Sequence, residues 1–102
     1  MAKRGQLTEA IKQKSMELLG VTITQREMRL MPYVQYCAVN DGFIDHIKTN
    51  AEERQILARW EFLRFGTFTG PRLDIEKKFW DAMGEIIWLS YVVYDSQEEA
   101  KQ

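Results

Sequence analysis

Hydrophobic side chains recur at helical spacing in four stretches of the chain, and polar side chains fill the positions between them. The first stretch predicts a helix over residues 8–19, with Gly20 in the position of a left-handed C-terminal cap. Thr24 followed by Glu27 is a capping-box pattern, in which the side chain of each residue accepts a hydrogen bond from the backbone amide of the other. A second helix is therefore predicted from Gln25.

Pro32 falls inside this second stretch. Proline in a helix interior removes a hydrogen bond and clashes with the preceding turn, at a cost of about 3 kcal/mol. We therefore predict a break, with one helix ending at Met31 and another starting with Pro32 in its first turn; a kink is the alternative. Residues 33–39 (YVQYCAV) are apolar apart from Gln35, a pattern that fits a buried helix or a strand equally well.

The third stretch, residues 49–66, carries the best helix signal. Two overlapping capping-box patterns begin at Thr49 and Asn50. Acidic residues fill the first turn, where their negative charge interacts favourably with the positive end of the helix dipole. Gly66 is predicted to end this helix.

The remaining sequence predicts two short extended pieces and a last helix. Thr67–Thr69 and Leu73–Ile75 flank a Gly-Pro turn, and a helix is expected over residues 75–91. The predicted fold is mainly α: a single compact domain over residues 1–102, with four or five helices and at most a small β-hairpin. Residues 1–6 and 95–102 are polar and are predicted to be flexible tails.

Composition narrows the class of protein. With 45% hydrophobic residues in 102, the chain can bury a core without disulfides, and its one cysteine, Cys37, allows none within the chain. A net charge of −1 lacks the basic excess of a dedicated nucleic-acid binder. The N-terminus has no apolar segment of a signal peptide, and the longest apolar stretch, residues 86–94, is too short to span a membrane. These features predict a cytoplasmic protein.

The sequence contains no catalytic pattern. No nucleophile elbow, phosphate-binding loop or dinucleotide fingerprint occurs. Cys37, His46, Asp41 and Asp45 match no standard metal-ligand spacing, and Cys37 lies in an apolar run where a thiol is inert. We therefore expect no enzyme activity, no metal, no cofactor and no small-molecule substrate.

Two DNA-binding arrangements are the alternatives. The first helix, the turn after it and the helix from Thr24 have helix-turn-helix spacing, which would present Gln25, Arg26 and Arg29 to base edges. However, Arg26 and Arg29 occupy positions where such a helix should be apolar. A winged-helix variant would use the predicted hairpin after the third helix, near Arg64 and Arg72.

The aromatic residues favour a protein partner instead. Aromatic residues make up 12% of the chain, which is a large share for a core of this size. Trp60 and Phe62 point to different sides of one predicted helix, so both cannot face the same core. Surplus aromatic surface is typical of interfaces with partners or between copies. The predicted partner surface comprises Tyr33, Tyr36, Phe62 and Phe68.

Three segments carry a resemblance: TQREMRLMPYVQY (24–36), EERQILARW (52–60) and FWDAMGEIIWLSYV (79–92). They resemble small uncharacterised proteins encoded by lambdoid phages and prophages. The resemblance implies an accessory protein that acts in a bacterial cytoplasm and binds a host or phage macromolecule. It transfers no site residues, so the leading prediction is a non-enzymatic interaction protein or regulator, with a DNA-binding regulator second.

Overall fold

The computed structural model describes residues 4–93, except for the side chain of His46. This part of the chain is mainly helical and contains one small antiparallel hairpin, so the predicted fold class is confirmed. The described elements are, in chain order, α1 (Glu9–Leu19), α2 (Gln25–Asn40), the 3₁₀-helix η1 (His46–Lys48), α3 (Ala51–Phe62), β1 (Gly66–Thr67), β2 (Asp74–Ile75), α4 (Lys77–Ile87) and the π-helical turn η2 (Trp88–Val92).

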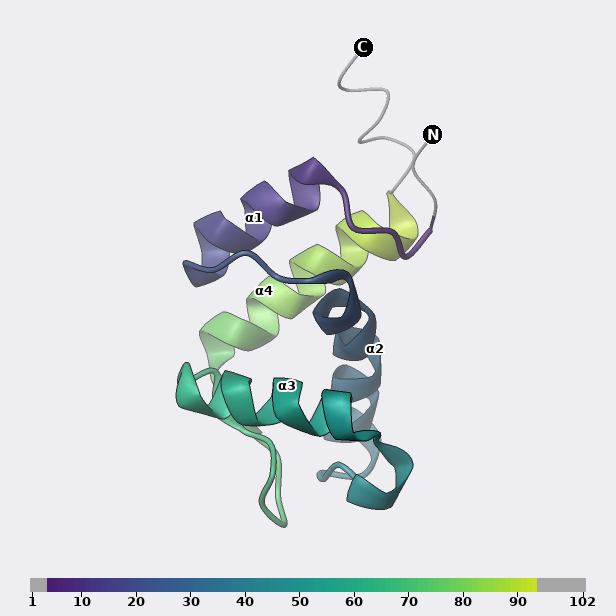
Figure 1. Ribbon diagram of the computed structural model, residues 1–102, viewed down its shortest axis with the longest axis vertical. Helices are drawn as coiled ribbons and strands as arrows, with labels where there is room; N and C mark the ends of the chain where they lie inside the picture. The colour runs from purple at the N-terminus through teal and green to yellow at the C-terminus, as the bar shows by residue number, and fades with distance from the viewer. Residues whose placement is uncertain (1–3, 94–102) are drawn as a thin grey trace.

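Helix α4 is the central element of the packing. Helix α1 lies beside it, α2 packs against it from the other side, and α3 crosses below and contacts α2 (Figure 1). Fully buried residues from α3, the hairpin and α4 form an aromatic centre: the Trp60 ring meets Phe68 and Phe79 edge to face, with ring centroids 5.6 and 5.0 Å apart. Of the helices described, none has the length and hydropathy to cross a membrane.

Side-chain caps fix where the first three helices begin. Thr8 caps α1, and both bonds of the capping box between Thr24 and Glu27 are present at α2. The third helix starts one residue after Asn50, which forms the capping box with Glu53. Of the two overlapping patterns predicted there, the second therefore supplies the cap, and Thr49 is buried instead.

The predicted break at Pro32 is wrong, because α2 runs through it without interruption. Met28, Met31 and Val34 surround the proline in sequence and are fully buried on one face of the helix. Burying each of these side chains stabilises the fold by about 1.5–3 kcal/mol, and together this offsets the proline penalty of about 3 kcal/mol. The helix also settles the conformation of residues 33–39.

The predicted end of the third helix is also corrected. The helix ends at Phe62, and Arg64 takes the left-handed conformation with φ of 65°. Its amide donates to the Glu61 carbonyl, and the Phe65 amide donates to the Trp60 carbonyl, both at 3.0 Å. This is a Schellman ending, in which glycine usually holds the left-handed position. Gly66 instead begins β1, where it pairs with Ile75.

The N-terminal segment is not a free tail throughout. Gly5 is buried, and its amide donates to the Ser90 carbonyl at 2.8 Å, so the prediction of a flexible segment over residues 1–6 is wrong at Gly5. Arg4 and Gln6 are exposed, and residues 1–3 and 95–102 lie outside the described residues, so at these positions the flexible tails stay a prediction.

One carboxylate organises the loop of the hairpin. Glu61 Oε1 accepts hydrogen bonds from the backbone amides of Phe68, at 2.7 Å, and Thr69, at 2.8 Å, and the Thr69 hydroxyl adds a third at 2.9 Å. These hydrogen bonds lower the pKa of the Glu61 carboxyl from its ordinary 4.5, and the bond from the Thr69 amide has the largest effect. The bonds from the Phe68 amide and the Thr69 hydroxyl also lower this pKa, whereas desolvation by burial raises it. The ionised form therefore holds the loop.

Acid is expected to remove this contribution. Because the pKa of Glu61 is lower in the folded protein, its stabilisation is full above the unfolded value and is lost as pH falls through the folded value. Glu61→Gln should cost about 1 kcal/mol at pH 7, and this deficit should shrink from about pH 5 downward. Thermal unfolding of both proteins between pH 7 and pH 3 measures the difference. A deficit that stays constant over this range would contradict the assignment.

Candidate functional site

The residues predicted to contact DNA lie together at the start of α2. Gln25, Arg26 and Arg29 line a pocket of about 210 Å³ with Leu30 and Glu53. Their polar groups, however, bind the chain itself. The Gln25 amide accepts from the Leu7 amide at 2.7 Å and donates to the Gly5 carbonyl at 2.8 Å.

The two arginines are engaged as well. Arg29 Nε donates to the Gly5 carbonyl at 3.2 Å, and Arg26 Nε pairs with Glu52 Oε1 at 3.0 Å. The donors that the helix-turn-helix prediction assigns to base edges thus hold the N-terminal segment and join α2 to α3. DNA binding stays a prediction, and these contacts do not favour it.

Gln25→Ala is expected to release the N-terminal segment. The substitution removes both hydrogen bonds of the side-chain amide and should cost about 1–2 kcal/mol. Hydrogen exchange at the Gly5 and Leu7 amides should accelerate far more than exchange in α3. Arg26→Ala is the matched control, because this exposed pair contributes about 1 kcal/mol or less. Unchanged exchange at Gly5 and Leu7 would refute the role of Gln25.

The predicted aromatic surface divides in the structure. Phe68 is 1% exposed and packs against Trp60 and Phe79, so the prediction for this residue is corrected to a core position. Phe62 is 85% exposed on α3, Tyr36 is exposed on α2, and Tyr33 is half-buried. Tyr33 and Tyr36 are one turn apart on α2, whereas Phe62 is the last residue of α3.

Tyr36 belongs to a different group of exposed hydrophobic side chains. Within twelve residues, the chain exposes Tyr36, Val39, Phe43 and Ile47 by 61%, 72%, 47% and 94%. They come from the last turns of α2, the following loop and η1, at the lower end of the molecule in Figure 1. We call this group the 36–47 surface. Three of its residues were not predicted, although apolar side chains in a turn-rich segment are a usable signal.

The loop that carries this surface is held in place. Ile44 is buried in the core, and the Gly42 carbonyl accepts from the Leu73 amide at 2.8 Å. The Asp45 carboxylate accepts from the Ile47 amide at 3.0 Å, which closes a side-chain turn. Ile47 therefore projects from a fixed backbone.

The charge beside the surface is mainly acidic. The pKa of the Tyr33 hydroxyl is raised to about 12, mainly by burial and then by the hydrogen bond with the Cys37 side chain. The negative charges of Asp45 and Asp41 also raise this pKa. Both carboxylates thus lie within electrostatic reach of α2. The basic residue nearest to this surface in the sequence is Lys48, which directly follows Ile47.

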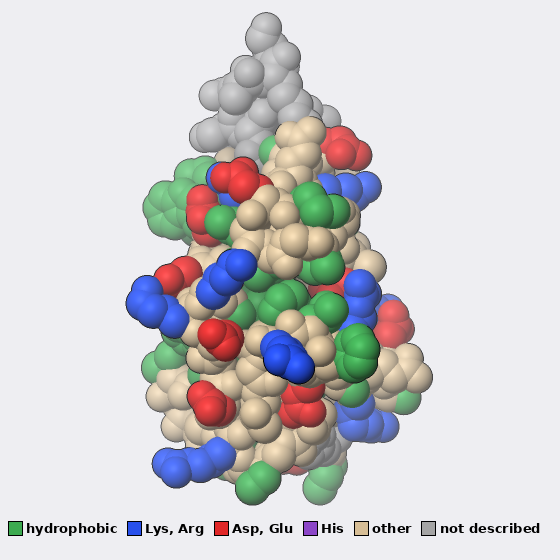
Figure 2. Space-filling model, turned by 90° about the vertical axis from the view of Figure 1, so that its left-hand side faces the viewer, with side chains coloured by type: hydrophobic (Ala, Val, Ile, Leu, Met, Phe, Trp, Pro, Cys, Tyr) green, Lys and Arg blue, Asp and Glu red, His purple; other side chains and the backbone are tan. Residues whose placement is uncertain are grey.

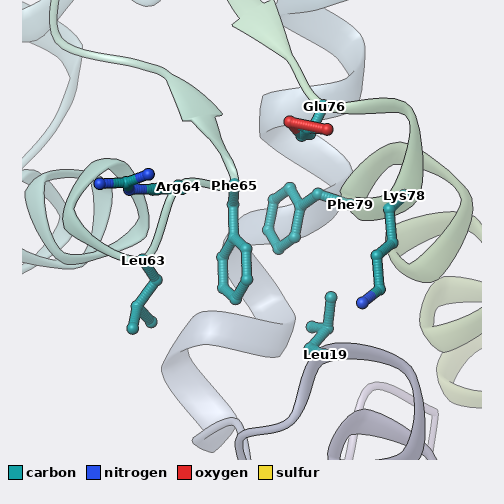
Figure 3. Close-up of a pocket in the computed structure, with 7 residues that line it drawn as sticks. All are labelled: Leu19, Leu63, Arg64, Phe65, Glu76, Lys78 and Phe79. Carbon is teal, nitrogen blue, oxygen red and sulfur yellow. The ribbon is translucent and has the colours of Figure 1, made fainter.

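A second feature is a pocket of about 280 Å³ where the ends of three helices meet. Leu19 comes from α1, residues 63–65 follow α3, and Glu76, Lys78 and Phe79 begin α4 (Figure 3). The rings of Phe65 and Phe79 stack 4.6 Å apart, with their planes within 7°. These helix ends face the viewer in Figure 2, where hydrophobic side chains gather near the middle of the face among basic and acidic ones. We call this the Phe65–Phe79 pocket.

No further chemistry gathers in the part of the chain that is described. Cys37 is buried, and the described side chains of residues 4–93, which do not include that of His46, contain no group of three or more metal-ligating residues. Comparison with protein-family models, curated proteins and solved structures finds no match. The resemblance to phage accessory proteins therefore stays a prediction.

Proposed function

We propose that the chain is a non-enzymatic interaction protein that binds a partner protein through the 36–47 surface. The observation that carries the proposal is the exposure of four large hydrophobic side chains on a loop and helix end that are otherwise well anchored. Exposed apolar groups on a rigid frame lose little conformational freedom when a partner covers them.

The charges indicate the chemistry of the partner. Asp41 and Asp45 lie in the same segment, and Asp41 has no ion-pair partner among the described residues. A protein segment with apolar side chains and neighbouring lysines or arginines is complementary to this surface. We therefore propose a basic, amphipathic segment as the occupant.

The test uses two labelled peptides of eighteen residues with leucines at helical spacing. In one peptide the polar positions are lysine, and in the other they are glutamate. Fluorescence anisotropy should show the lysine peptide binding at least tenfold tighter, and Val39→Ala with Ile47→Ala should weaken it by about tenfold, because truncating two anchors costs more than 1 kcal/mol. Asp41→Asn should weaken it further.

Phe62→Ala is the matched control. Phe62 is 85% exposed, which is more than Tyr36, Val39 or Phe43 and less than Ile47, but it lies at the C-terminal end of α3. If this substitution weakens binding as much as the Val39 and Ile47 changes do, or if both peptides bind equally, the proposed surface is wrong.

A further inference from the structure

The Phe65–Phe79 pocket combines an apolar interior with cations at its edge. Leu19, Leu63 and Phe65 are partly exposed in it, and the fully buried Phe79 backs Phe65. Its volume of about 280 Å³ is close to the lower end of the range for small-molecule sites, about 300–1,000 Å³. The pocket is therefore large enough for a compact ligand with a flat apolar body.

Two cations border the pocket without ion-pair partners in the described part of the chain. Arg64 and Lys78 are both exposed, whereas the neighbouring Lys77 pairs with Asp81 at 2.8 Å. One anion, Glu76, also lines the pocket; it lies at the opposite end from the Lys78 ammonium, which runs toward Leu19 (Figure 3). A ligand's negative charge is thus favoured at the Lys78 end.

Arg64 belongs to the frame of the pocket and does not supply its charge. It is the one residue other than glycine with positive φ in the described chain, and it occupies the position of a Schellman ending where glycine would be unstrained. Its guanidinium extends away from Phe65 and Phe79 (Figure 3). Lys78 is therefore the cation that faces the pocket.

We infer that the Phe65–Phe79 pocket binds a small amphipathic carboxylate, with an aromatic or branched apolar body against Leu19, Leu63 and Phe65. The ligand's carboxylate lies at the Lys78 end. This inference is independent of the 36–47 surface, which consists of other residues.

The probe is 2-naphthoate, with neutral 2-naphthamide as the matched ligand, titrated into the ¹⁵N-labelled protein and followed by NMR. Naphthoate should shift the backbone amide resonances of Leu19, Leu63 and Phe65. It should bind about fivefold tighter than naphthamide, because a solvent-exposed ion pair contributes up to about that factor in affinity. Equal affinity of the two ligands, or shifts confined to other parts of the chain, would overturn the inference.

Lys78→Gln tests the charge at the pocket. This variant should weaken naphthoate about fivefold, which removes its advantage over the amide. Glu76→Gln should strengthen naphthoate, and Lys77→Gln is the control that should leave it unchanged. Arg64→Gly should raise the melting temperature, because glycine relieves the left-handed strain, without weakening naphthoate. If Lys78→Gln leaves naphthoate affinity intact, the position assigned to the carboxylate is wrong.

Discussion

Glu27→Ala is expected to lower the free energy of unfolding by about 2–4 kcal/mol, from the loss of a helix cap together with a stranded buried donor. Glu27 is 3% exposed, and its Oε2 accepts from the indole nitrogen of Trp60 at 2.8 Å. Its Oε1 accepts from the Thr24 amide at 3.0 Å and lies 3.7 Å from Arg59. Alanine leaves the indole N–H of the fully buried Trp60 without its partner.

Glu53→Ala is the matched control, and urea denaturation measures both variants. Glu53 has the same place in its capping box, where it accepts from the Asn50 amide at 2.9 Å, but it bonds to no buried side chain within the described part of the chain. Its loss should cost only about 0.5–1 kcal/mol. The same loss for both variants would show that the bond between Glu27 and Trp60 adds nothing.

Gly66→Ala is the second substitution with a large expected effect, about 2–3 kcal/mol. At φ of 153°, a Cβ on Gly66 would overlap the Asp74 carbonyl oxygen and lie 3.0 Å from the Ile75 Cα. Both atoms belong to the backbone of the paired strand, so no side-chain rotation relieves the overlap. The hairpin must open, which loosens Phe68 in the core.

Gly70→Ala provides the comparison within the same hairpin. A Cβ there would meet only the Thr67 methyl group, at an ordinary 3.6 Å, so the change should be close to neutral. Thermal unfolding followed by circular dichroism distinguishes the two variants. A Gly66→Ala protein as stable as the Gly70→Ala protein would contradict the hairpin pairing.

The helices were predictable because their signals are local. Capping boxes at Thr24 and Asn50 and the glycine cap at Gly20 depend only on neighbouring residues, and each has the predicted geometry. The error at Pro32 arose because the gain from burying one face of α2 comes from residues far away in the sequence. The same limit applied to Gly66, whose role depends on the strand opposite.

The candidate sites were less predictable, since exposure is decided by tertiary packing. Phe68 and Phe62 look alike in the sequence, but the first fills the space beside Trp60 and the second faces solvent. Gln25 was identified as a polar contact residue, yet its contacts are to the backbone of Gly5 and Leu7. No local pattern distinguishes an amide that binds a partner from one that binds its own chain.

The 36–47 surface is proposed to receive a protein partner. The most direct measurement is NMR chemical-shift mapping of the ¹⁵N-labelled protein with the lysine-containing amphipathic peptide. We expect the largest shifts at the amides of residues 36–48, and we expect these shifts to be lost in the protein with Val39→Ala and Ile47→Ala. Shifts centred on Gln25, Arg26 and Arg29, or spread evenly over the chain, would contradict this proposal.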